Sequence, residues 1–178
     1  MAEKRERLRR CRMNESELIL AAVWRWFPPR RWAVCENVYW GFGLLYEADA
    51  IAVSKSARVH ELEAKSAASD LKRDARKHKW QRLPQVDYIW YIVPEPLADL
   101  ALELGKPLGL GVLVVSEPKD DLVIGECRRL AMPKLRRGQD QRQDVVRDRR
   151  NVIWRLAALR YWDERVHRLQ KSAGKVLV

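Results

Sequence analysis

Two acidic residues and a lysine in one short part of the chain could together form a site for metal-dependent chemistry. Asp49 lies in YEADAIAV, and Glu63 and Lys65 follow in HELEAK. Carboxylate oxygens, with water and phosphate, are the ligands that Mg²⁺ prefers. A nearby lysine could orient a water molecule or stabilise charge on a phosphate. The residue types therefore indicate a Mg²⁺ site, provided that the fold brings them together.

The stretch HELEAKSAASDLKRD, residues 60–74, allows two structures with different consequences. On a helix, Glu61 and Lys65 would form a solvated ion pair one turn apart. On a strand, Glu61, Glu63 and Lys65 would project from one side of a sheet. The apolar pattern changes at Lys65, after which a helical stripe begins. We therefore predict a strand over 58–65 and then a helix, with Ser66 or Ser69 as its cap.

A β-hairpin is predicted to bring the acidic residues together. Residues 46–53 and 58–65 have strand character, and the small polar segment 54–57 joins them. Alternation places Glu47 and Asp49 on one side of the first strand, and Glu63 and Lys65 on one side of the second. Like charges opposed across a sheet destabilise it. A divalent cation between Asp49 and Glu63 would offset that repulsion.

The remaining elements predict an α/β fold with a mixed sheet. A helix begins after Asn14 or Ser16, and the run WAVCENVYW predicts a strand over 32–40. Further along, 86–93 and 108–115 are apolar runs typical of buried strands, and 94–104 between them is helical. The predicted order is helix, three-stranded meander, helix, strand, helix, strand, with one more edge strand possible after residue 122.

Positive charge is concentrated at the C-terminal end of the chain. The 178 residues carry a net charge of +11, and residues 128–171 hold 14 Lys or Arg against 5 Asp or Glu. Residues 141–171 contain neither Pro nor Gly and predict a long amphipathic helix. We therefore expect a basic N-terminal arm over 1–13, a folded domain over 14–125 and a basic extension over 126–178. The charge indicates a polyanionic partner.

The cysteines and the apolar runs indicate the cellular compartment in which the protein functions. Cys11, Cys35 and Cys127 are odd in number and show no metal-binding spacing, as expected in a reducing compartment. No stretch approaches the roughly 20 apolar residues of a membrane span. A soluble, cytoplasmic protein is therefore expected.

The pattern resembles the PD-(D/E)XK nuclease superfamily. Asp49 precedes Glu63-Ala64-Lys65 by 14 residues, within the order helix, three strands, helix, strand. The segments ADAIAV, ELEAKSAASDLKRD and DYIWYIVP resemble most the MmcB-like group, described as DNA-repair endonucleases. The resemblance covers about residues 16–115. It departs at Ala48, where the superfamily often has proline.

The resemblance implies a restriction-endonuclease-like core and a DNA endonuclease that uses Mg²⁺ or Mn²⁺, acting in repair or recombination. Asp49, Glu63 and the carbonyl of Ala64 would bind the metal, and Lys65 would serve the attacking water. Glu36 and Glu17 match positions where superfamily members often carry an additional acid. Strand-end solvation and helix N-terminal charge explain these two equally well.

Polar and basic residues after Lys65 are candidates for contact with DNA. The set is Ser66, Lys72, Arg73, Arg76, Lys77, Arg136 and Arg137. Capping and an ordinary solvated helix face are the alternatives for those on the helix. Two rival functions also remain at this point. The chain could be a nucleic-acid-binding protein without cleavage, or an interaction protein that forms a homodimer through the C-terminal helix.

Overall fold

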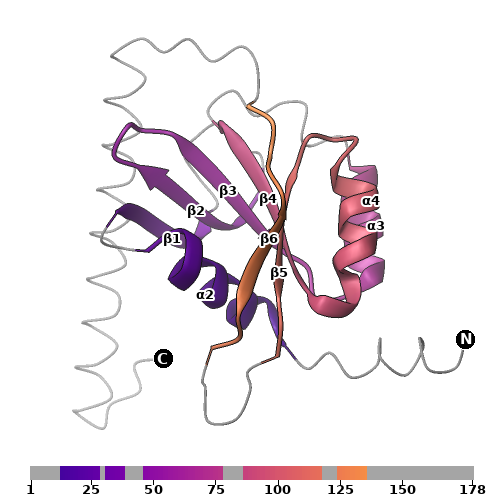
Figure 1. The fold of residues 1–178 in the computed structure, drawn as a ribbon. Coiled ribbons are helices and arrows are strands. Elements are labelled where there is room, and N and C mark those ends of the chain that lie inside the picture. Colours follow the sequence, from indigo (N-terminus) through magenta and orange to yellow (C-terminus); the bar gives the residue numbers. More distant parts are fainter. Residues whose placement is uncertain (1–12, 29–30, 39–45, 78–85, 118–123, 136–178) are drawn as a thin grey trace, which may run out of the picture.

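The computed structural model describes residues 13–28, 31–38, 46–77, 86–117 and 124–135. These residues form a mixed sheet with helices on both of its faces (Figure 1). In chain order the elements are α2 Glu15–Trp26, β1 Trp32–Val38, β2 Ala48–Ser54, β3 Val59–Ala64, α3 Ala68–Arg76, β4 Tyr88–Pro94, the 3-10 helix η2 Glu95–Leu97, α4 Ala98–Gly105, β5 Gly111–Val115 and β6 Cys127–Ala131.

The sheet has six strands in the order β1-β2-β3-β4-β5-β6. Strands β1, β2 and β3 are antiparallel neighbours, β3, β4 and β5 are parallel, and β6 pairs antiparallel with β5. The predicted α/β class, mixed sheet and element order are confirmed. The sheet continues to Ala131 in β6, beyond residue 125, where the sequence placed the end of the folded domain.

Each face of the sheet buries its own hydrophobic cluster. Ile51, Tyr91 and Val112 belong to the cluster that includes Leu71 of α3 and Ala101 of α4. The opposite cluster includes Ala50, Leu62, Trp90 and Leu113 of the sheet, together with Leu18 and Ala22 of α2. Successive residues therefore alternate between the α3–α4 face and the α2 face from Ala50 to Val53 of β2 and along β4 and β5. This alternation decides which charged side chains share a side.

The hairpin of β2 and β3 forms as predicted. Ala50 pairs with Leu62 and Val53 with Val59. The turn between the strands closes with Ala57 N–H donating to the Ser54 carbonyl at 2.9 Å. Ala57, the last residue of this turn, has a φ of 59°, as in hairpins where a left-handed residue follows the two central residues of the turn. The short turn fixes the register, so the two strands must present Asp49 and Glu63 to each other.

One helix cap is as predicted and one is not. The Asn14 side chain accepts a hydrogen bond from Glu17 N–H, and the Glu17 carboxylate accepts one from Asn14 N–H, which completes a capping box. The prediction that Ser66 or Ser69 caps the next helix is wrong. The N-cap of α3 is Ala67, without a side-chain hydrogen bond. Ser66 comes one residue too early, and Ser69 is already the second helical residue.

Several predictions lie outside the described residues. They are the basic arm over residues 1–13, of which only Met13 is described, the long helix over 141–171, and the DNA contacts of Arg136 and Arg137. Within the described ranges, none of the helices has the length and apolar character needed to cross a membrane.

Candidate functional site

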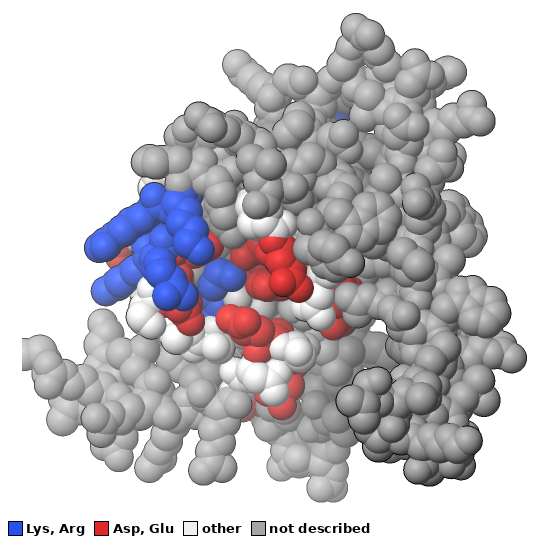
Figure 2. Space-filling model, turned by 180° about the vertical axis from the view of Figure 1, so that it is seen from behind, with Lys and Arg blue, Asp and Glu red and all other residues white. Residues whose placement is uncertain are grey.

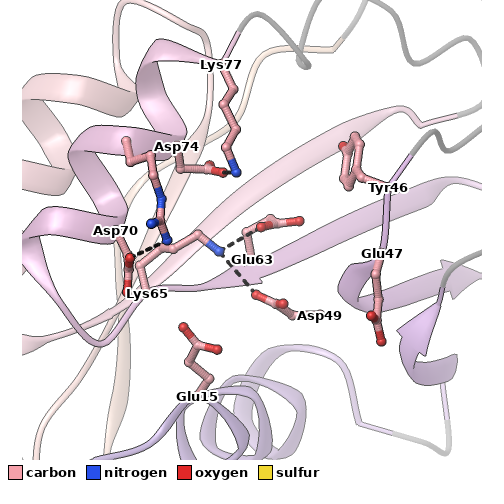
Figure 3. Close-up of a pocket in the computed structure, with 10 residues that line it drawn as sticks. Glu15, Tyr46, Glu47, Asp49, Glu63, Lys65, Asp70, Asp74 and Lys77 are labelled. Atoms are coloured by element: carbon pink, nitrogen blue, oxygen red, sulfur yellow. Dashed lines mark hydrogen bonds and ion pairs between the residues drawn. The ribbon is translucent and has the colours of Figure 1, made fainter.

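A pocket of about 490 Å³ lies at the carboxyl end of β3. In α/β sheets this end of the parallel strands is the usual place for a ligand. Figure 3 shows Lys65 pointing toward Glu63 and Asp49, and Glu15 approaching them from α2. The lining residues are Glu15, Tyr46, Glu47, Asp49, Glu63, Lys65, Asp70, Arg73, Asp74 and Lys77.

The hairpin brings Asp49 and Glu63 to the same place, as predicted. The register of Ala50 with Leu62 sets these two residues opposite each other one position further along. Glu63 pairs with Tyr91, which belongs to the α3–α4 cluster, and the Lys65 ammonium contacts both the Glu63 and the Asp49 carboxylates. The Ala64 backbone N–H donates to Asp49 Oδ2 at 2.8 Å, which fixes the carboxylate against the end of β3.

Lys65 occupies the centre of this group. Its backbone N–H donates to the Ile92 carbonyl at 2.9 Å, so the strand pairing with β4 continues one residue past Ala64. Its ammonium Nζ lies 2.8 Å from Glu63 Oε2, 3.0 Å from the Ala64 carbonyl oxygen and 3.4 Å from Asp49 Oδ2. The Lys65 ammonium therefore contacts all three oxygen atoms that the sequence predicts as metal ligands.

The oxygen set fits a hydrated Mg²⁺ or Mn²⁺ ion. Among the residues that the structure describes, no group of three or more His, Cys, Asp and Glu side chains is arranged to hold a metal. Asp49, Glu63 and the Ala64 carbonyl supply two carboxylates and one neutral oxygen. Mg²⁺ usually takes one or two carboxylates and completes its octahedron with water and phosphate. Asp49, Glu63 and the Ala64 carbonyl would hold such an ion.

Burial and neighbouring charges shift the pKa values of both Asp49 and Lys65. Burial, and then the nearby Glu63 carboxylate, raises the pKa of Asp49 to about 6, against the smaller effects of Lys65 and the Ala64 N–H. Burial alone would lower the pKa of Lys65, but Glu63 and Asp49 outweigh it and hold that pKa above its ordinary value. Lys65 therefore stays charged at neutral pH, and Asp49 is ionised only above about pH 6.

Two further carboxylates lie behind the site, each hydrogen-bonded by a tyrosine. Tyr46 Oη donates to Glu61 Oε1 at 2.6 Å, and Tyr91 Oη donates to Asp74 Oδ2 at 3.1 Å. Glu61 and Asp74 are buried, with exposures of 0% and 3%. Burial and then the neighbouring carboxylate raise the pKa of Tyr46 and that of Tyr91 above the ordinary range. Both hydroxyls therefore remain protonated donors.

Sequence reasoning missed Asp74, Tyr91, Tyr46 and Glu15. A signal for Asp74 was present, because it falls on the inward stripe of α3 with Leu71, and these two are the buried residues of that helix. Tyr91 lies 17 residues further along the chain, on strand β4. The sequence offered no signal for that pairing.

The two additional acids suggested by the family resemblance lie away from the pocket. Glu17 belongs to the capping box of α2, and Glu15, two residues earlier, lines the pocket instead. Glu36 pairs with Ala50, so its side chain lies on the α2 face of the sheet. Neither Glu17 nor Glu36 is among the lining residues.

Basic residues of α3 flank the acidic pocket. Figure 2 shows acidic side chains gathered beside a group of Lys and Arg side chains. Arg73 and Lys77 line the pocket, and Lys72 and Arg76 are exposed on the same helix. Arg73 Nη2 contacts Asp70 Oδ1 at 2.6 Å, and Lys77 Nζ lies 4.0 Å from Asp74 Oδ1. The predicted contact Ser66 is half-buried just before α3.

Comparison with known proteins identifies a similar fold. No family model matches the chain, and no curated protein matches it. A solved structure, the SPO1766 protein of unknown function from Silicibacter pomeroyi, is similar at a TM-score of 0.54 and 20% sequence identity. The match covers 84% of this chain and 93% of that chain. The likeness therefore concerns the fold.

Proposed function

We propose that this chain is a metal-dependent endonuclease that hydrolyses DNA phosphodiester bonds, built on a restriction-endonuclease-like core and acting in repair or recombination. One observation carries the proposal: Asp49, Glu63, the Ala64 carbonyl and Lys65 converge on one point at the end of β3. The resemblance of Asp49 and Glu63-Ala64-Lys65 to the PD-(D/E)XK pattern supports it. No membrane-spanning helix occurs among the described residues.

The chain's own residues have separate roles in this proposal. Asp49 and Glu63 present carboxylate oxygens, and the backbone of Ala64 both fixes Asp49 and offers a third oxygen. A divalent cation held there supplies Lewis-acid polarisation of the phosphate and lowers the pKa of water. Lys65 brings a permanent positive charge, which stabilises the negative charge that builds up on the phosphate during hydrolysis.

The surroundings of the pocket suit a nucleic acid. The exposed Lys72, Arg73, Arg76 and Lys77 stand beside the acidic site, where they would contact phosphates on either side of the scissile bond. The net charge of +11 favours association with a polyanion. The acidic pocket itself repels DNA unless a cation offsets its carboxylates, so binding and metal loading should support each other.

The testing experiment is cleavage of single-stranded, duplex and branched DNA with Mg²⁺ or Mn²⁺. The parent is compared with Asp49→Asn and Glu63→Gln, which keep size but remove charge. Each change should lower the rate at least about 100-fold, since each removes a charged metal ligand. Glu103→Gln on the exposed side of α4 is the matched control and should retain parental activity.

Two results would refute the proposal. Metal-dependent cleavage that survives both Asp49→Asn and Glu63→Gln would show that another site or a contaminant cuts the DNA. Tight DNA binding without cleavage of any substrate would favour the non-catalytic binding protein that the sequence also allows.

A further inference from the structure

The Lys65 ammonium lies where the proposed metal would have to bind. Its Nζ is 2.8 Å from Glu63 Oε2, 3.0 Å from the Ala64 carbonyl and 3.4 Å from Asp49 Oδ2. Lys65 is only 9% exposed, and Glu63 is 2% exposed. The lysine therefore lies inside the group of oxygens, as their counter-ion, and not at the rim of the pocket.

A divalent cation and this ammonium exclude each other. An Mg²⁺ ion lies about 2.1 Å from its oxygen ligands. An ion bound to the same three oxygens, each within 3.4 Å of Nζ, would lie next to the ammonium, and two like charges so close repel strongly in a buried site. Occupation of the oxygen group by one cation therefore requires that the other leave it.

The pocket has room for the displaced ammonium. Lys65 has a flexible four-carbon stem, and the pocket of about 490 Å³ opens directly beside it. The carboxylates of Glu15, Asp70 and Asp74 line the same pocket and could receive the displaced charge. A phosphate of bound DNA would be an equally suitable partner.

Resting on the proposed nuclease function, we infer that Lys65 is the resident cation of the metal-free site and that a divalent ion binds only by displacing its Nζ from Asp49, Glu63 and the Ala64 carbonyl. In the metal-free protein the ammonium keeps the buried carboxylates neutralised and the site folded. Metal entry releases it into the pocket, toward the position of the substrate. The lysine thus reaches its catalytic position only when the metal is present.

Mn²⁺ affinity measured by titration calorimetry at pH 8 tests this inference without relying on activity. Lys65→Met removes the charge and retains the bulk, so Mn²⁺ no longer has to displace a cation. Its Mn²⁺ dissociation constant should fall at least about tenfold, while its Tm without metal should drop. Lys106→Met is the matched control, since Lys106 is an exposed lysine that does not line the pocket. Its affinity should change by less than about threefold.

A second measurement on the parent chain covers the case in which Lys65→Met does not fold. The ¹⁵N resonance of the Lys65 ammonium should be protected from exchange without metal, and should move or broaden on saturation with Mg²⁺. A resonance that saturating Mg²⁺ leaves unchanged overturns the displacement.

The outcomes separate this inference from the proposed function. Equal or weaker Mn²⁺ binding by Lys65→Met overturns the displacement, even where the parent cuts DNA. Tighter binding by Lys65→Met, with a parent that cuts no DNA, supports the displacement and counts against the nuclease. Absence of Mn²⁺ binding in both proteins overturns the displacement and the metal site together.

Discussion

The Glu63 carboxylate and the Lys65 ammonium form a buried ion pair, with Oε2 and Nζ 2.8 Å apart. The two residues are neighbours on one side of an extended chain, because β3 continues through Ala64 and Lys65 still pairs with β4. The pair keeps the pKa of Lys65 above its ordinary value. Burial and the Glu63 carboxylate raise the pKa of Asp49 to about 6, so the ionisation of this carboxylate changes near physiological pH.

Metal binding should weaken as the pH falls through about 6, the pKa to which burial and Glu63 raise Asp49. Above that pH the carboxylate is ionised and can bind a cation, and below it a proton competes. The association constant for Mn²⁺ should fall by about tenfold per pH unit below 6 and stay level above it. Titration calorimetry between pH 5 and pH 8 checks this. A constant affinity over that range would contradict the assigned pKa of Asp49.

The core of the site could be predicted because it depends on local geometry. Period-two alternation placed Glu63 and Lys65 on one side of a strand, and a short hairpin turn placed Asp49 opposite. These relationships involve two neighbouring strands of one hairpin. Tyr91 and Asp74 meet instead through the packing of α3 against β4. A contact of that kind depends on how helix and sheet pack, which alternation and turn length do not specify.

The Tyr91 hydroxyl should contribute measurably to stability. It donates to Asp74 Oδ2 at 3.1 Å, and Asp74 is 3% exposed, so water cannot readily replace the bond. Tyr91→Phe should lower the free energy of unfolding by about 1–3 kcal/mol. Tyr88→Phe, on the opposite face of β4, should change it by less than about 0.5 kcal/mol. Urea unfolding at pH 7 measures both, and equal effects would contradict the proposed role of the hydroxyl.

The choice between Glu15 and Glu17 shows why helix positions were harder to predict. Both acids lie in the first turn of α2. Glu17 is three residues after Asn14, the spacing of a capping box, and its carboxylate is used there. Glu15 is not part of the capping box and lines the pocket instead. Local spacing could have identified the capping box, but which side of the helix faces β2 and β3 follows from its packing on the sheet.

His60 should make the protein less stable in acid. Trp90 Nε1–H donates to His60 Nδ1 at 3.0 Å, and the ring lies against Trp32 with centroids 4.9 Å apart. Burial, and then the Arg58 charge, lowers the pKa of His60 from 6.5 to about 4. As the pH falls from 6.5 toward 4, the unfolded chain takes up a proton that the folded state does not. About 1–3 kcal/mol of stability should be lost over this range through His60.

NMR titration and a variant separate this effect from other acid-sensitive groups. The His60 ring protons should titrate near pH 4 in the folded protein. His60→Gln removes the titrating group, so its unfolding free energy should vary less between pH 6.5 and pH 4 than that of the parent. A His60 pKa of 6 or above would contradict the neutral, buried imidazole.

The basic residues of α3 should contribute affinity for DNA without sequence preference. Lys72 and Arg76 are exposed on α3. The residues that follow them in the sequence, Arg73 and Lys77, line the pocket. If each contacts a phosphate, Lys72→Ala with Arg76→Ala should weaken binding of several unrelated duplexes alike. The slope of log K against log salt should become shallower by about 2, since each contact releases about one counterion. Lys106→Ala, an exposed lysine at the end of α4, is the control and should leave the slope unchanged. An unchanged slope in the double variant would mean that DNA approaches the pocket from another side, and that the acidic site is reached without the help of α3.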